Sequence, residues 1–345
     1  MRIAIVTDAW KPQVNGVVTT LTHVGECLAR AGHTIRFITP LDFRTVPCPT
    51  YPEIGLALRP GSKLRALLDA FTPECIHIAT EGPLGWAARA YCLRRGLPFT
   101  SAYHTQFPQY LRLRAPIPLR LSYALLRRFH NAAARTLVAT QSVYDELSER
   151  GFRNLVLWPR GVDASVFKPY DKAFLPDPRP IALYVGRVAV EKNIEAFLRL
   201  SLPGTKIVVG DGPDLERLRS QYPQVRFVGY RRGKELARYY AAADLFVFPS
   251  RTDTFGLTML EAMACGIPVA AYPVTGPKDV VQDGLTGALD EDLERACRRA
   301  LELDPSHALS YARSRSWGAC AATLLEHLVP LHSNRTGLQT PAPGR

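Results

Sequence analysis

Two acidic side chains in one short stretch of the chain have the type and spacing of a ligand-binding pair. Residues 246–270 read FVFPSRTDTFGLTMLEAMACGIPVA, which predicts a buried strand, a polar turn, a helix and the start of another strand. Asp253 lies in the turn, and Glu261 lies inside the helix. Carboxylates accept hydrogen bonds from sugar and ribose hydroxyls. The pair is therefore a candidate for binding a sugar.

The start of the expected helix, at Thr254, Phe255 and Gly256, adds a second property. A helix N-terminus offers free backbone N–H groups and the positive end of a dipole, which suits phosphate. Together with the carboxylates, it predicts a site for a phosphorylated sugar donor. The alternative is an ordinary strand–turn–helix unit with Glu261 on a solvated face. The small apolar residues 262–265 argue against it, because a carboxylate among them needs a partner.

A second candidate anion site follows a strand expected at residues 181–185. Arg187 and Lys192 come after that strand. The guanidinium could bind two phosphate oxygens, and the ammonium could add a mobile charge. The P-loop pattern Gly-x4-Gly-Lys-Ser/Thr is absent, and two unconnected surface bases are the alternative. Gly212 and Tyr230 follow the next two strands, where they could flank a nucleotide base or belong to plain turns.

The first half of the chain offers a glycine and a histidine next to expected secondary structure. Gly16 ends a long loop just before a helix, which lets the backbone approach a ligand closely. This loop lacks GxGxxG, which argues against a nicotinamide dinucleotide. His104 follows a strand expected at residues 98–103. A histidine at a strand end is either functional or structural, and its position favours function.

The elements that would position these residues form two similar blocks. In the first block, strands are expected at residues 2–7, 34–39, 75–79, 98–103 and 136–140, and helices at 18–31, 63–71, 85–95 and 118–134. In the second block, strands are expected at 181–185, 206–209, 225–228, 245–248 and 267–271, and helices at 193–200, 215–221, 234–242 and 293–303. Such alternation predicts an α/β protein with two doubly wound parallel sheets and a ligand cleft between them.

The domain organisation follows from a proline-rich break between the blocks. Residues 155–180 read as a connector, so we expect an N-terminal domain over residues 1–165 and a C-terminal domain over residues 166–312. Residues 331–345 are polar and rich in proline, which predicts a disordered tail.

Composition excludes several classes of protein. The 345 residues suffice for two domains. No apolar run approaches the roughly 20 residues that span a bilayer, and the N-terminus lacks the features of a signal peptide. The seven cysteines include no CxxC pair, so we expect neither disulfides nor a zinc site. We expect a cytoplasmic, reduced protein without metal or cofactor.

The formal net charge of +12 is concentrated in one unusual segment. Residues 82–144 contain nine arginines and no Asp or Glu, and residues 110–130 read YLRLRAPIPLRLSYALLRRFH. The segment could be an anionic-membrane surface, a plain solvated face or a nucleic-acid surface. Apolar side chains between the arginines favour the membrane, and no nucleic-acid-binding motif is present. The candidate membrane and acceptor residues are Arg112, Arg114, Arg127 and Arg128.

Five motifs in order give the chain a family resemblance. PxVNGV, YHT, GRVAVEKN, GDGP and PSRTDTFGLTMLEAMACGIPV extend over most of the sequence. In this the chain resembles the retaining glycosyltransferases of family 4, and most of all their bacterial lipid-directed α-mannosyltransferases and glycosyl- or sulfoquinovosyl-diacylglycerol synthases. The resemblance implies a GT-B fold, in which two Rossmann-like domains face each other across a cleft, the first binding the acceptor and the second the nucleotide-sugar. It also implies that a final helix, near residues 316–330, packs back onto the first domain.

The resemblance also implies a role for each candidate residue. Arg187 and Lys192 would bind the donor diphosphate and stabilise the leaving group in place of a metal ion. Glu261 would bind the ribose. Asp253 would bind the transferred sugar, with backbone N–H groups of residues 254–256 nearby. The substitution would take place on the front face of the sugar without a separate nucleophile.

Two further residues receive roles in this way, and two positions depart from the family pattern. Gly16 would let its loop close on the diphosphate, and His104 would contact the sugar near the reacting carbon. The family's Glu-x7-Glu pair begins here with Asp253, whose side chain is shorter by one methylene. Arg160 stands where many relatives carry Asn, and it would contact either the acceptor or only the surface between the domains.

The expected function is metal-independent transfer of a hexose of the mannose, glucose or glucuronic acid type. The donor would be a GDP- or UDP-sugar and the acceptor a lipid, at the inner face of an anionic membrane. Nucleic acid is not an expected partner. The alternatives are a nucleotide-sugar epimerase or hydrolase, a transferase with a soluble or polysaccharide acceptor, and a non-catalytic sensor.

Overall fold

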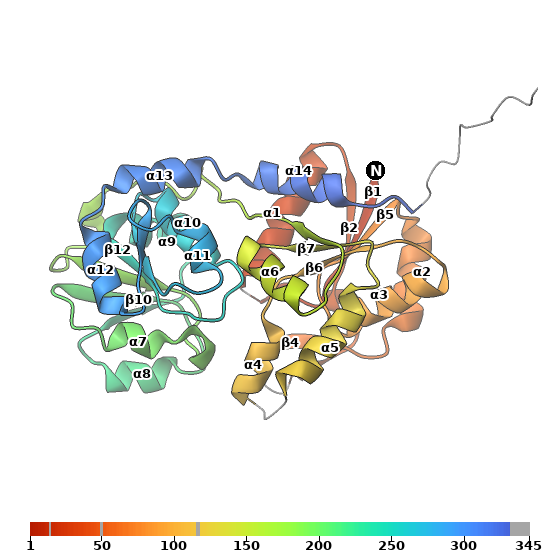
Figure 1. The fold of residues 1–345 in the computed structure, drawn as a ribbon, viewed down its shortest axis with the longest axis horizontal. Coiled ribbons are helices and arrows are strands. Elements are labelled where there is room, and N and C mark those ends of the chain that lie inside the picture. The colour runs from red at the N-terminus through yellow and green to blue at the C-terminus, as the bar shows by residue number, and fades with distance from the viewer. Residues whose placement is uncertain (14, 49–50, 115–117, 332–345) are drawn as a thin grey trace, which may run out of the picture.

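The computed structural model describes residues 1–345 except 14, 49–50, 115–117 and 332–345, and it contains two α/β domains (Figure 1). The first sheet contains β1 (Arg2–Val6), β2 (Thr34–Ile38), β5 (Cys75–Ile78), β6 (Thr100–Tyr103), β7 (Arg135–Val138) and β8 (Leu155–Leu157). Its strand order is β2-β1-β5-β6-β7-β8, and all the pairs are parallel.

The second sheet contains β9 (Ile181–Val185), β10 (Thr205–Val209), β11 (Arg226–Gly229), β12 (Leu245–Phe248), β13 (Val269–Ala271) and β14 (Gly287–Leu289). Its order is β11-β10-β9-β12-β13-β14, again with parallel pairs. The predicted α/β architecture with two doubly wound parallel sheets is therefore confirmed.

Helices cover both faces of each sheet (Figure 1). Those of the first domain are α1 (Gly16–Arg30), α2 (Gly61–Phe71), α3 (Pro83–Arg94), α4 (Phe107–Arg114), α5 (Leu119–His130) and α6 (Gln141–Glu149). Those that follow are α7 (Ile194–Leu198), α8 (Leu215–Gln221), α9 (Gly233–Ala242), α10 (Leu257–Ala264), α11 (Pro277–Val280), α12 (Leu293–Leu301), α13 (Pro305–Arg313) and α14 (Trp317–His327). None of the helices in the described ranges is long and apolar enough to cross a bilayer.

The strands are apolar on both faces because both faces are covered. In β1, Ile3 and Ile5 pack into one core cluster of the first domain, and Ala4 and Val6 pack into another. The second domain likewise has two clusters. These layers leave the carboxyl ends of the strands and the loops after them to carry the site.

The chain crosses between the domains twice, and the two crossing segments lie side by side. The backbone N–H of Val162 donates to the carbonyl of Arg315. After the second crossing, α14 packs against α1, and its Trp317 and Leu324 join a core cluster of the first domain (Figure 1). The last segment of the chain therefore holds the first domain next to the second.

Several elements escaped the sequence-based expectation. Residues 155–157 were expected in a connector, but they form the edge strand β8. An antiparallel hairpin, β3 (Thr45–Cys48) and β4 (Tyr51–Ala57), was not foreseen. The helix expected at 118–134 ends at His130, because Asn131 leaves it to bond the carbonyl of Gly151 and the N–H of Arg153.

The domain limits at residues 165 and 312 remain predictions. The first residue of the expected disordered tail, Leu331, is ordered. The N–H of Leu331 donates to the carbonyl of Glu74, and the Leu331 side chain packs against a core cluster. The rest of that tail, residues 332–345, lies outside the described residues.

Candidate active site

The neighbouring strands β9 and β12 bring two of the predicted residues together. Lys192 ends a short 3-10 helix after β9, and Asp253 lies in the loop after β12. The Nζ atom of Lys192 is 2.6 Å from Oδ1 of Asp253, and both side chains are largely buried. Side chains of Thr252 and Asn193 bond backbone carbonyls of the facing loop, which fixes the two loops against each other.

The second oxygen of the Asp253 carboxylate has no donor in the described part of the chain. Oδ2 is buried and has no hydrogen-bond partner among the residues that the structure describes. A buried carboxylate oxygen without a donor costs about 1–3 kcal/mol or more. A sugar hydroxyl that donates to Oδ2 would relieve this cost, which agrees with the sugar-binding role expected for Asp253.

The loop that carries Asp253 is hydrogen-bonded to the first domain through Thr254. The hydroxyl of this buried residue donates to the carbonyl of His104 at 2.7 Å. The hydroxyl of Thr140, after β7, donates to the carbonyl of Thr254 at 3.2 Å. His104 therefore lies at the domain boundary, where it is bonded to Thr254, the residue that follows Asp253 in the chain.

The N-terminus of α10 is next to the same loop. Gly256 precedes α10 with a φ of 83°, a conformation that favours glycine, and a Cβ there would be 2.7 Å from Met259. Phe255 packs half-buried against the second-domain core. Gly16 lies across the domain boundary, since a Cβ on it would be 3.5 Å from Leu257. That ordinary contact leaves room for a side chain, so the protein alone does not demand a glycine at position 16.

Glu261 has a buried tyrosine as its hydrogen-bond partner. The hydroxyl of Tyr240, on α9, donates to Oε2 of Glu261 at 2.9 Å. Burial raises the pKa of Glu261 to about 7, although the bond from Tyr240 lowers it. The small apolar residues that follow Glu261 in the sequence correctly indicated this environment. The partner itself lies 21 residues away in the chain, on another helix.

This pKa leads to a pH prediction for nucleotide binding. If the ionised Glu261 carboxylate accepts the ribose hydroxyls, a proton competes with the ligand below pH 7. The affinity for the nucleoside diphosphate, GDP or UDP, should then fall about tenfold per pH unit below 7 and level off above it. Isothermal titration calorimetry from pH 5.5 to 8 measures this. Glu261→Gln, which cannot ionise, is the reference, and an identical pH dependence in both proteins would contradict the assignment.

The remaining donor-site candidates are Arg187, Gly212 and Tyr230, which follow the strands β9, β10 and β11. Arg187 follows β9 directly, and its carbonyl accepts a bond from the Tyr184 hydroxyl. Gly212 has a structural reason to be glycine, because a Cβ there would be 2.3 Å from the carbonyl oxygen of Val188. Tyr230 is 43% exposed and follows the edge strand β11, which β10 and β9 separate from β12. The donor-binding roles of these three residues remain predictions.

Arg160 is a residue whose place the sequence did not reveal. It is 5% exposed, and its guanidinium lies 4.4 Å from the ring centroid of Trp158. One Nη donates to the Trp158 carbonyl, and the other lies 3.2 Å from Nδ1 of His104. Arg160 is therefore buried against His104 at the domain boundary, and whether it contacts the acceptor stays a prediction. Its PRGVD context, next to the proline-rich break, carried no signal for this contact.

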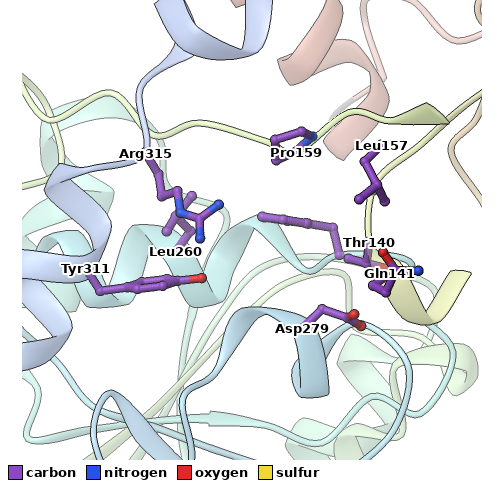
Figure 2. Close-up of a pocket in the computed structure, with 10 residues that line it drawn as sticks. Thr140, Gln141, Leu157, Pro159, Leu260, Asp279, Tyr311 and Arg315 are labelled. Carbon is purple, nitrogen blue, oxygen red and sulfur yellow. The ribbon is translucent and has the colours of Figure 1, made fainter. Parts of the chain in front are cut away.

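A cavity of about 250 Å³ also lies between the domains (Figure 2). Gln141 and Leu157 line it from the first domain, and Leu260, Tyr311 and Arg315 line it from the other side. Of the expected site residues, Phe255 alone is among those that line this cavity. The cavity thus adjoins the loop that holds Asp253, but neither Lys192 nor Asp253 is among the residues that line it. Within the described ranges, no group of three or more His, Cys, Asp or Glu could hold a metal ion.

The arginine-rich segment forms α4 and α5, which lie side by side at the lower edge of the first domain (Figure 1). On α5, Leu121 and Leu125 are 58% and 54% exposed, one helical turn apart. Arg112 and Arg128 are also exposed. Arg127 is exposed too, but it donates one bond to the carbonyl of Arg150. The side chain of Arg114 lies outside the described residues. The face thus has apolar and basic side chains together.

Comparisons with known proteins agree with the geometry. Residues 14–166 match the model "Glycosyltransferase Family 4", and residues 179–303 match "Glycosyl transferases group 1". A GDP-mannose-dependent alpha-mannosyltransferase of Mycobacterium tuberculosis (strain CDC 1551 / Oshkosh) is 32% identical, over 97% of this chain and 98% of its own. The chain belongs to glycosyltransferase family 4. It is a retaining hexosyltransferase, as the resemblance predicted.

Other relatives of this glycosyltransferase point to the same family and fold. An alpha-monoglucosyldiacylglycerol synthase of Streptococcus pneumoniae (strain ATCC BAA-255 / R6) is 29% identical, over 90% of this chain and 81% of its own. The structure of sucrose-phosphate synthase from Thermosynechococcus elongatus superposes with a TM-score of 0.77 at 23% identity, covering 94% of this chain and 97% of that one. The predicted GT-B fold is thereby confirmed.

Proposed function

We propose that this glycosyltransferase moves mannose from GDP-mannose to a lipid acceptor at an anionic membrane surface. The donor follows from the similarity to proteins named GDP-mannose-dependent alpha-mannosyltransferases, which extends over nearly the whole chain in the mycobacterial and corynebacterial examples. The observation that carries the acceptor proposal is the exposed pair of leucines between arginines on α5.

The site supports a front-face substitution. Arg187 and Lys192 bind the diphosphate and stabilise the negative charge that develops on it as the bond from the sugar C1 to the phosphate oxygen breaks. Asp253 accepts a hydroxyl of the sugar, and Glu261 accepts the ribose hydroxyls. The acceptor hydroxyl forms the new bond to C1 on the same face, and its proton passes to the leaving phosphate oxygen. The configuration at C1 is retained.

The α4–α5 face supports docking on a membrane. Leu121 and Leu125 can enter the headgroup layer while the arginines meet lipid phosphates. Each basic group near an anionic leaflet contributes about 1 kcal/mol. A few such groups with apolar neighbours suffice to hold the enzyme reversibly at the surface, where a lipid acceptor presents its hydroxyl.

Removing two of these charges should weaken membrane binding measurably. Arg112→Ala/Arg128→Ala is expected to bind vesicles that contain anionic phospholipid roughly 30-fold more weakly, from about 1 kcal/mol per charge. Co-sedimentation measures the binding. Arg217→Ala/Arg219→Ala on α8 removes two exposed arginines from the second domain and serves as the control. Equal binding by the two double variants would dispose of the docking face.

A panel of donors tests the function as a whole. The enzyme is incubated with GDP-mannose, UDP-glucose or UDP-glucuronate and vesicles that contain diacylglycerol and its glycolipids, and the lipids are weighed by mass spectrometry. We expect a hexose added to a lipid with GDP-mannose as the fastest donor. Transfer with UDP-sugars alone would refute the donor, and free sugar without glycolipid would indicate a hydrolase.

A further inference from the structure

Arg160 is a buried cation without an acidic partner. In the described part of the chain, no carboxylate forms an ion pair with its guanidinium, which is enclosed by Trp158, His104 and the thiol of Cys320. Burial of a charge without a counter-charge is costly, and a neutral side chain of similar size would avoid that cost. The contact that Arg160 makes with His104 is therefore a reason to look for a function.

The hydrogen bond between these two residues fixes the protonation of His104. A guanidinium has only donors and stays protonated. Its bond to Nδ1 of His104, at 3.2 Å, requires a lone pair on that nitrogen. The imidazole must then be neutral and carry its proton on Nε2. A protonated or Nδ1–H histidine would direct a hydrogen at the arginine's own hydrogen.

The groups around the His104 imidazole also favour its neutral form. The charged or titratable groups that face it are Arg160 on the crossing segment, His77 on β5 and His130 on α5, each of which carries or can acquire positive charge. Burial and then Arg160 hold the pKa of His104 well below its usual range. The Trp158 ring system and the imidazole also pack edge to face, with the ring centroids 5.6 Å apart.

The residue that carries the fixed Nε2–H is hydrogen-bonded to the neighbour of Asp253. Nε2 is buried and, like Oδ2 of Asp253, lacks a hydrogen-bond partner within the described residues. The carbonyl of His104 is bonded by Thr254, the neighbour of Asp253. One unpaired donor and one unpaired acceptor thus flank the domain boundary. A sugar, whose hydroxyls both accept and donate, can satisfy both.

We propose that Arg160 is a positioning residue, which holds His104 in the neutral Nε2–H tautomer so that this N–H donates to an oxygen of the transferred sugar. The ligand in this statement rests on the proposed function, whereas the tautomer does not. His104 then serves as a hydrogen-bond donor throughout the reaction and neither accepts nor releases a proton. The acceptor's proton goes to the leaving phosphate.

The tautomer can be measured without any substrate. In protein labelled with ¹⁵N-histidine, long-range ¹H–¹⁵N correlation spectra distinguish a protonated from an unprotonated ring nitrogen, and His104→Asn identifies the His104 signals. We expect an unprotonated Nδ1 and a protonated Nε2 that do not change from pH 5.5 to 8. A His104 signal that titrates in this range, or a proton on Nδ1, overturns the proposal whether or not the enzyme transfers sugar.

Variants separate this role from a structural one. In Arg160→Met, we expect His104 to show a second tautomer or to titrate, and kcat to fall about tenfold or more with GDP-mannose and to gain a dependence on acidic pH. Arg160→Lys keeps a charged donor and should restore part of kcat. Arg89→Met is the matched control, because Arg89 also stacks on a tryptophan and bonds backbone carbonyls.

Two outcomes would contradict the account even if the variants fold well. The first is a His104 spectrum in Arg160→Met that is unchanged from the original protein. The second is a loss of kcat in Arg89→Met equal to that in Arg160→Met. Loss of any arginine that stacks on a tryptophan would then lower kcat, with no special role for the contact with His104. Should Arg160→Met fail to fold, the spectrum of the original protein and the Arg160→Lys variant still decide the question.

Discussion

Replacing Lys192 by alanine is expected to reduce kcat about 10²–10³-fold, the usual consequence of removing one group that stabilises developing charge in an active site. Lys192 pairs with Asp253 across 2.6 Å. Because a diphosphate carries more negative charge than one carboxylate, we expect it to attract the ammonium and leave Asp253 to the sugar hydroxyl. Initial rates at saturating donor and acceptor measure the effect.

The control for this variant is another lysine of the same domain that also forms an ion pair. Lys172→Ala breaks a bond of 3.0 Å to Asp244 on an exposed part of the second domain. This change should leave kcat within about twofold, as surface pairs contribute little. Circular dichroism checks that both variants fold. A rate for Lys192→Ala close to that for Lys172→Ala would remove Lys192 from the site.

Replacing Glu261 by alanine is expected to reduce kcat/KM about 10²–10⁴-fold. Two ribose hydroxyls that donate to one carboxylate contribute about 1.5–3 kcal/mol each, and each 1.4 kcal/mol is a factor of ten. The loss should appear mainly in the KM for the nucleotide-sugar, because the ribose is remote from the bond that breaks. Steady-state kinetics with the donor varied separates KM from kcat.

Tyr240→Phe refines this test. It removes the hydroxyl that donates to Glu261 at 2.9 Å but keeps the ring. Since that bond lowers the pKa of Glu261, its loss should raise the pKa above about 7 and move the decline of donor affinity to higher pH. A profile that moves to lower pH, or a KM for Glu261→Ala equal to that of the original enzyme, would contradict the ribose assignment.

The sequence was sufficient for the architecture because the strands are continuous apolar runs. LFVF at Leu245–Phe248 is buried on both faces, and such a run followed by a turn and a helix predicts a central parallel strand. β8 escaped because it is three residues long and pairs on one side alone. The β3–β4 hairpin escaped because β3 is largely exposed and includes Pro47.

The candidate site was predictable where local chemistry decides and unpredictable where long-range contacts decide. The turn with Asp253 and the helix with Glu261 could be predicted, because the polar turn and the apolar residues after Glu261 are visible in the local sequence. Tyr240, the partner of Glu261, and Arg160, the partner of His104, come from other elements. Nothing in their own segments indicates the contact, which arises when the domains fold.

We propose that this family 4 enzyme transfers a hexose with retention to a lipid, and the anomeric configuration of the product is the decisive measurement. GDP-α-mannose and a lipid acceptor are incubated with the enzyme, and the glycolipid is purified and examined by ¹H and ¹³C NMR spectroscopy. The account predicts an α-mannosyl lipid. A β-linked product, or free mannose with no glycolipid formed, would contradict it.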